Sequence, residues 1–173
     1  MLGAFAWLTA PAQESSNWET YVAEADKRPV SVMADLAFGT SPEAKIKTNV
    51  IIISISLLTG NNNGMPSYAE AKKLDTVENK LVQVLGDSLN ATYAGRYTQN
   101  GKRDYFFYTA DTSKYRQYAF NALGTYASGR WDMMAKPDPM LDNYFTVLYP
   151  SQKKEMQRIY NRRMLDRLAD AGD

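Results

Sequence analysis

Alternation of apolar and polar residues predicts two strands near the start of the chain. They run from Trp18 to Ala25 and from Pro29 to Phe38, and Asp26-Lys27-Arg28 joins them. In the second strand Val30, Val32, Ala34 and Leu36 share one face. The run NVIIISISLL at residues 49–58 is almost continuously apolar and β-branched, which predicts a central strand covered on both faces.

The pattern changes to a helical period in SYAEAKKLDTVENKLVQVLG. Ser67 and Glu70 form a capping box directly after Pro66, and Gly86 is expected to end the helix. The expected buried stripe is Leu74, Val77, Leu81 and Leu85. The flanking stretches GTSPEAK and TGNNNGMP have the composition of loops.

A β-hairpin is predicted in YAGRYTQNGKRDYFFYT, with strands over residues 91–99 and 102–110. The pair Asn100-Gly101 lies between them and is the preferred pair for a type I′ turn. On the second strand Arg103, Tyr105 and Phe107 share one face, and Asp104, Phe106 and Tyr108 share the other. One aromatic row should therefore pack on helices, while the other is exposed or covered by terminal segments.

The remaining chain adds helices and one strand. We expect a helix over about residues 113–127 followed by Gly129, a strand at RWDMMAK and one short helix in PDPMLDNYFTVLYPS. Ser151 should cap a last helix that ends near Ala169. Its expected inward residues are Met156, Ile159, Tyr160, Met164 and Leu168.

From Asn49 the order β-α-β-β-α-β predicts an α+β fold with a ferredoxin-like antiparallel sheet. Right-handed crossovers would place both helices on one face. The N-terminal hairpin would extend the sheet or cap its edge, and the C-terminal helix would dock as an addition. We expect residues 17–173 to form one domain and residues 1–16 to be a signal remnant or an N-terminal arm.

Composition excludes several kinds of chemistry. The chain has no His and no Cys, which removes His- and Cys-based nucleophile systems and His- or thiolate-ligated metals. Lys and Arg number 20 against 19 Asp and Glu, so no global field attracts nucleic acid. The start MLGAFAWLTAPAQESS resembles the back half of a secretory signal. A periplasmic or secreted protein is favoured over a cytoplasmic one, and no stretch is long enough to span a membrane.

The candidate binding residues concentrate on the hairpin. Aromatic and guanidinium groups dominate interface hot spots, although cross-strand packing in the core is the favoured alternative for these rings. Backbone amides of the loop before the first long helix could hold an anion. The candidates are Arg96, Tyr97, Arg103, Tyr105 and Phe107 in the hairpin, and Asn63 and Gly64 in the loop.

Three other features give weaker support for a functional site. The last helix contains Lys153, Lys154, Arg158, Arg162, Arg163 and Arg167, for which a solvated face is favoured over a nucleic-acid patch. Asp138 and Asp142 lack the positions of an EF-hand, and Ser151 beside two lysines is a helix cap. We assign no catalytic residue, metal or cofactor.

An ordered set of motifs resembles the bacterial domain of unknown function 695 family. The set is Trp18-x-x-Tyr21, NNNGMPSYAEAKKLDTVENKL, YAGRYTQNGKRDYFFYT, DPMLDNYFTVLYPS and a closing motif at residues 168–173. One departure is Leu141, where the resemblance implies Trp. The family has no established activity, and its topology resembles that of a regulatory protein of ribonuclease E, which is an analogy of fold alone.

The prediction is therefore a non-catalytic binding or interaction module whose partner is an unidentified protein or small ligand. The alternative is a nucleic-acid-associated or ribonuclease-regulating protein that uses the hairpin aromatics and the basic last helix. A third class, a carboxylate-based hydrolase, stays open only because Asp and Glu are plentiful.

Overall fold

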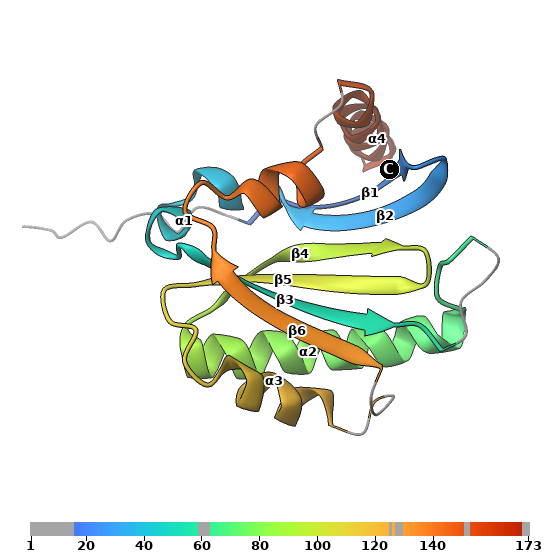
Figure 1. The fold of residues 1–173 in the computed structure, drawn as a ribbon. Helices are drawn as coiled ribbons and strands as arrows, with labels where there is room; N and C mark the ends of the chain where they lie inside the picture. The colour runs from blue at the N-terminus through green and yellow to red at the C-terminus, as the bar shows by residue number, and fades with distance from the viewer. Residues whose placement is uncertain (1–15, 59–62, 125, 127–129, 151–152, 171–173) are drawn as a thin grey trace, which may run out of the picture.

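A six-stranded antiparallel sheet runs through the molecule, shown as a computed structural model in Figure 1. The structure describes residues 16–58, 63–124, 126, 130–150 and 153–170. The strand order is β1-β2-β4-β5-β3-β6. The strands are β1 (Trp18–Ala25), β2 (Arg28–Asp35), β3 (Asn49–Ser56), β4 (Thr92–Gln99), β5 (Lys102–Thr109) and β6 (Trp131–Pro137).

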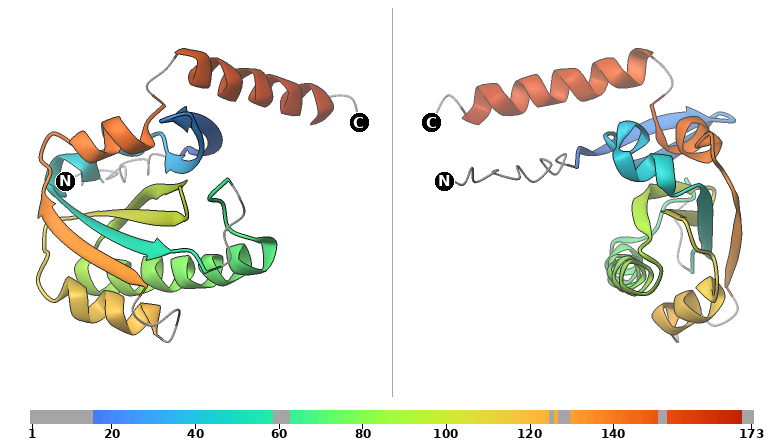
Figure 2. Two further views of the ribbon diagram at one scale, coloured as in Figure 1. Left: turned by 45° about the vertical axis from the view of Figure 1, so that its right-hand side comes forward. Right: turned by 90° about the vertical axis from the view of Figure 1, so that its left-hand side faces the viewer.

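Helical segments lie on both faces of this sheet, as the views in Figures 1 and 2 show. The long helix α2 (Tyr68–Leu89) and α3 (Tyr115–Leu123) cover one face. The 3-10 helix η1 (Phe38–Thr40), α1 (Pro42–Ile46), the π-helical turn η2 (Tyr144–Leu148) and α4 (Lys153–Asp170) lie on the other. The α+β class is thus confirmed. The complete strand order differs from that of a four-stranded ferredoxin-like sheet, because β1 and β2 extend the sheet beyond β4.

Strand β5 contributes side chains to two separate hydrophobic cores. Tyr105 and Phe107 belong to the core under α2 and α3. Phe106 and Tyr108 belong to the core on the opposite face, because successive side chains on a strand point in opposite directions. There the Phe38 ring lies 4.9 Å from the Tyr108 ring, centroid to centroid. The second aromatic row of the hairpin is therefore covered by η1 and η2.

The Asn100-Gly101 turn has the predicted conformation. Asn100 has φ 50° and Gly101 has φ 75°, which is the left-handed backbone that both central residues of a type I′ turn require. The turn between β1 and β2 uses Asp26 and Lys27 in the same conformation, with φ 52° and 59°. The sequence predicted that Asp26-Lys27-Arg28 joins the two strands, but not this turn type, because Asp-Lys is not a favoured pair for it.

Several predicted boundaries were wrong for local reasons. The stretch GTSPEAK is not only loop, since Ser41 caps α1 by accepting a hydrogen bond from the Ala44 amide at 3.2 Å. Helix α2 does not end at Gly86 but continues to Leu89, and Asn90 ends it with φ 48°. The next helix is shorter than predicted, because it ends at Gly124.

The predicted inward face of the last helix was also wrong. Of its members, Ile159 is buried, whereas Met156, Tyr160 and Met164 are exposed. Among the strands and helices it is β1 that α4 mainly contacts, so the helix has little surface against which an apolar stripe could pack. The side chain of Leu168 and the predicted cap Ser151 lie outside the described residues. So do residues 1–15 of the predicted signal remnant or N-terminal arm.

Candidate functional site

Part of the sheet face opposite α2 and α3 is left open. Beyond the area covered by η1 and η2 lies a hollow of about 420 Å³. Its floor is the sheet, and one wall is the segment that contains η2. The lining residues are Ile52, Ser54, Tyr97, Lys102, Asp104, Phe106, Met134, Asn143, Thr146 and Val147.

The strand register explains why these side chains meet. Tyr97 of β4 lies opposite Asp104 of β5, which in turn lies opposite Ser54 of β3. In the next row Phe106 lies opposite Ile52, which is paired with Met134 of β6. One row is therefore polar and the other apolar, and both come from cross-strand neighbours on a single face.

The polar row is already hydrogen-bonded. The Ser54 hydroxyl donates to Asp104 Oδ1 at 2.5 Å, and Lys102 Nζ lies 3.5 Å from the same oxygen. The Tyr97 hydroxyl donates to Gln99 Oε1 at 2.9 Å. Burial and the nearby carboxylates of Asp104 and Asp26 raise the pKa of Tyr97, so the hollow presents a neutral phenol at physiological pH.

The wall of the hollow is held in place by Asp138, which is 3% exposed. Asp138 Oδ2 accepts a hydrogen bond from the Tyr108 hydroxyl at 2.7 Å, and its Oδ1 accepts one from the Asp142 amide at 2.8 Å. The Asn143 amide and side chain also donate to Oδ2, at 3.1 and 3.0 Å. The carboxylate therefore organises the turn that leads into η2.

These hydrogen bonds also bear on whether Asp138 and Asp142 could bind a cation. Donors from the turn surround the Asp138 carboxylate, so it does not present free oxygens to a metal ion. Within the described ranges of the chain no group of three or more Asp or Glu residues is placed to hold a metal.

The structure separates the seven predicted binding residues into three places. Tyr105 and Phe107 are 0% exposed and Arg103 is 6% exposed, so these side chains meet α2 rather than solvent. A direct contact of either ring with a partner would require this core to open. Of the seven, Tyr97 is the residue that lines the hollow.

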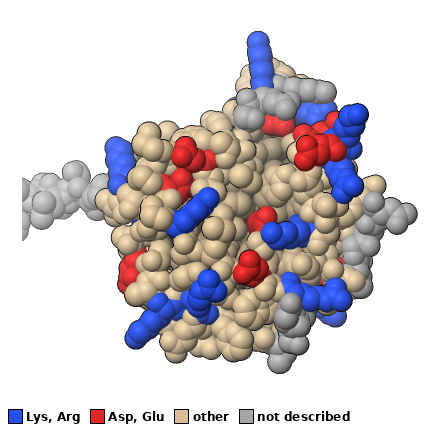
Figure 3. Space-filling model, in the orientation of Figure 1, with Lys and Arg blue, Asp and Glu red and all other residues tan. Residues whose placement is uncertain are grey.

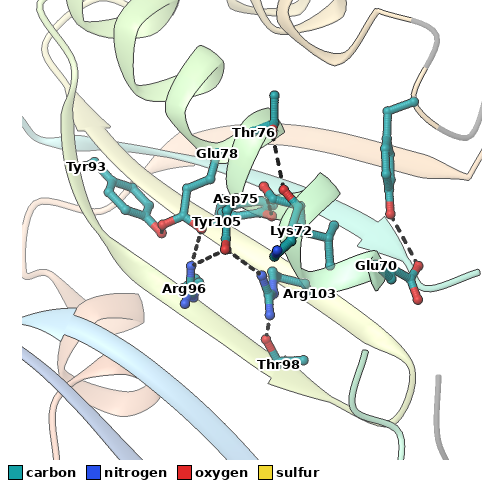
Figure 4. Close-up of polar contacts among 12 residues, drawn as sticks. Glu70, Lys72, Asp75, Thr76, Glu78, Tyr93, Arg96, Thr98, Arg103 and Tyr105 are labelled. Atoms are coloured by element: carbon teal, nitrogen blue, oxygen red, sulfur yellow. Dashed lines mark hydrogen bonds and ion pairs between the residues drawn. The ribbon is translucent and has the colours of Figure 1, made fainter. Parts of the chain in front are cut away.

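Arg96 belongs to a polar network between α2 and the hairpin, shown in Figure 4. The buried Glu78 carboxylate binds Arg96 and accepts a hydrogen bond from the Tyr93 hydroxyl at 3.0 Å. Asp75 Oδ1 lies 3.5 Å from the Arg96 guanidinium and 3.9 Å from that of Arg103. Burial and the Glu78 charge raise the pKa of Tyr93 well above its usual range, which keeps its hydroxyl protonated as a donor to Glu78.

Asn63 and Gly64 lie at the tip of the hairpin. The Gly64 carbonyl accepts a hydrogen bond from the Gly101 amide at 2.9 Å. A Cβ on Gly64 would lie 2.6 Å from the Asn100 Cα, and Gly64 has φ 75°. Gly64 is therefore explained by the close approach of two backbones, and Asn63 beside it is exposed.

The sequence did not single out most residues of the hollow. Ser54 and Met134 come from strands far apart in the chain, and Thr146 and Val147 come from η2. Alternation along β5 did place Asp104 and Phe106 on one face, but it did not mark that face as a site. No local signal could have shown that η2 stops short and leaves that part of the face open.

The cations of the last helix are partly neutralised. Arg162 and Arg163 both pair with the buried Glu19 on β1, and Arg158 lies near Glu155 in the groove between α4 and β1. On the face shown in Figure 3, Lys and Arg side chains are interspersed with Asp and Glu. The basic helix thus presents fewer free cations than its sequence suggested.

Comparison with known proteins gives a family and no activity. No curated protein and no solved structure matches the chain. Within the described part of the chain, no helix has both the length and the apolar character that a membrane span requires. The family match covers residues 16–149, so α4 and the motif at residues 168–173 lie outside it. The chain belongs to the family described as a family of unknown function, DUF695.

Proposed function

We propose that this protein is a non-catalytic binding module whose ligand occupies the hollow on the open sheet face. The observation that carries the proposal is the combination of an apolar row and a polar row on the floor of one hollow. Binding sites for small molecules are concave, mostly apolar and supplied with a few fixed polar groups. The occupant would be a small ligand or a projecting group of a partner protein.

Size and rigidity support this proposal. A hollow of about 420 Å³ lies within the range of roughly 300–1,000 Å³ that is usual for such sites. The four strands β3 to β6 fix its floor, and the Asp138 bonds fix the turn that forms its wall. A preformed site loses less entropy on binding than a flexible one.

The polar groups of the hollow support binding without turnover. Lys102 pairs with Asp104 rather than with Ser54, so Ser54 has a carboxylate as its partner and not an amine base. The chain contains neither His nor Cys, the residues that most often activate or act as nucleophiles. The arrangement can orient a hydrogen-bonding ligand, because it offers a carboxylate, an ammonium and a phenol close together.

We further propose that residues 49–137 correspond to a ferredoxin-like unit to which the β1–β2 hairpin has been added. What supports this is the order β6-β3-β5-β4 within the sheet, together with α2 and α3 on one face. The added hairpin pairs with β4 through β2 and extends the sheet beyond that strand.

Binding can be tested by recording amide chemical shifts of the labelled full chain against a library of small fragments. Binders should shift the amides of residues around Tyr97, Asp104 and Thr146. The variant Thr146→Arg should abolish these shifts, because Thr146 is exposed and lines the hollow. Thr76→Arg on α2 is the matched control, since it adds the same charge on the opposite side of the sheet.

Two results would contradict the proposal. Fragments that bind equally well to Thr146→Arg would place the binding site elsewhere. Turnover of a generic ester, phosphate or glycoside that disappears in Asp104→Asn would show that the hollow is catalytic.

A further inference from the structure

Strand β6 forms one edge of the sheet, and nothing described covers its outer side. Among the described strands it pairs with β3 alone, and the right-hand view of Figure 2 shows it along the outside of the molecule. An edge strand presents unpaired amides and carbonyls to any strand that can lie beside it. The residues of β6 are Trp131, Asp132, Met133, Met134, Ala135, Lys136 and Pro137.

The hydrogen-bond pattern shows which backbone groups face outward. The Ser56 amide donates to the Arg130 carbonyl at 2.8 Å, and the Asp138 amide donates to the Thr48 carbonyl at 2.8 Å. Even-numbered residues of β6 therefore face β3, and odd-numbered residues face outward, because these groups alternate in an antiparallel ladder. The outward amide of Met133 bonds instead to the neighbouring Asp132 Oδ1 at 2.8 Å.

We propose that the β6 strands of two copies of this chain pair in an antiparallel manner about a two-fold axis at Met134. In this register the Met133 amide leaves Asp132 Oδ1, and Met133 lies opposite Ala135 of the second copy and exchanges backbone hydrogen bonds with it. Trp131 lies opposite Pro137, which lacks an amide but still offers a carbonyl to the Trp131 amide. The two six-stranded sheets become one continuous sheet.

Charge complementarity selects both the partner and the register. Asp132 and Lys136 are exposed, and the two-fold axis at Met134 places each Asp132 opposite a Lys136. They form positions without backbone hydrogen bonds, where opposing side chains come closest. A register shifted by two residues places Asp132 opposite Met134 or opposite the buried Asp138 instead.

Apolar surface around the edge is covered in the same arrangement. Met134 is 45% exposed and would meet its own copy on the axis. On the helix side, Phe120 is 54% exposed and lies edge-on to Trp131 at 5.7 Å between centroids. A hollow of about 350 Å³ with Arg116 and Gln117 adjoins these rings. Because the axis is perpendicular to the sheet, both α3 helices lie on one face and become neighbours.

The test is the mass of the full chain in solution, measured by sedimentation equilibrium over a concentration series. The wild type should form dimers, whereas Asp132→Lys and Lys136→Glu should each raise the dissociation constant by about tenfold or more, because each places two pairs of like charges in contact. Both residues are exposed, and unchanged circular dichroism would show that each variant is folded.

Swapping the charges at positions 132 and 136 tests whether this particular pairing holds the dimer together. The double variant Asp132→Lys, Lys136→Glu should recover the dimer, because the two signs are complementary again. An equimolar mixture of the two single variants should form a heterodimer, since each cation of one chain then faces an anion of the other. A wild type that stays monomeric, or a dimer that is indifferent to both single changes and not restored by their combination, would overturn the proposal.

Discussion

Both faces of β5 carry aromatic side chains, but the two faces differ in how completely other elements cover them. On one face Tyr105 and Phe107 are closed over completely by α2 and α3. On the other, Tyr108 and Phe106 are buried under η1 and η2, but Asp104 lies beyond them in the open hollow. The difference teaches that aromatic content alone does not mark a binding surface, because the extent of the covering layer decides what remains accessible.

The largest expected effect comes from removing a ring on the closed face. Phe107→Ala should lower the free energy of unfolding by about 3–5 kcal/mol, because it leaves a cavity in a packed core. Val147→Ala on the wall of the hollow should cost less than about 1.5 kcal/mol, since Val147 is only partly buried. Urea denaturation measures both values, and equal losses would mean that the two faces are equally closed.

A smaller loss in the free energy of unfolding is expected when one carboxylate on each face of the sheet is replaced by its amide. Glu78→Gln should cost about 1–3 kcal/mol, because Arg96 and Tyr93 lose a buried charged partner. Asp104→Asn should cost less than about 1 kcal/mol, because its pair with Lys102 lies near solvent. Urea denaturation at neutral pH provides the comparison. A greater loss in Asp104→Asn would show that the polar row of the hollow holds the fold together.

The smallest expected effect is a change in how steeply the free energy of unfolding falls at alkaline pH. Burial raises the pKa of both Tyr105 and Tyr108 above the ordinary value of 10.0, and the Asp138 hydrogen bond raises that of Tyr108 further. The unfolded chain therefore loses these protons first as the pH rises through 10, so the free energy of unfolding falls from there upward.

Tyr105→Phe and Tyr108→Phe should each make this alkaline decline less steep. The measurement is urea denaturation at several values between pH 8 and 11. Tyr108→Phe should also lose stability at neutral pH, because the Tyr144 amide then lacks the hydroxyl that accepts its hydrogen bond at 3.0 Å. A slope identical to that of the wild type in both variants would show that other tyrosines govern the alkaline limit.

Local signals in the sequence were sufficient for the elements that depend on neighbouring residues. Asn100-Gly101 fixed the hairpin turn, and Ser67 marked the start of α2, where its hydroxyl accepts from the Glu70 amide at 3.3 Å. The β-branched run at residues 49–58 correctly indicated a strand with buried residues on both faces. Each of these features is decided within a few residues by backbone sterics or by a single hydrogen bond.

Contacts between segments that are distant in the sequence could not be predicted from local patterns in the same way. The apolar stripe of α4 has helical spacing, but spacing does not say whether another surface covers it, and Met156 and Tyr160 proved exposed. The hollow depends on the Asp138 turn and on strands that are distant in sequence. Its polar row needs Ser54 and Asp104 to come together, which only the β3–β5 register determines.

The alternation along β5 also has a consequence for cooperativity. Two hydrophobic clusters on opposite faces of a sheet could in principle melt one after the other, as separate units of local unfolding. Here a single strand supplies Tyr105 and Phe107 to one cluster and Phe106 and Tyr108 to the other. Displacing β5 from the sheet removes interior residues from both at once. The shared strand therefore links the two halves energetically, and heat or denaturant should disrupt them in one step rather than two.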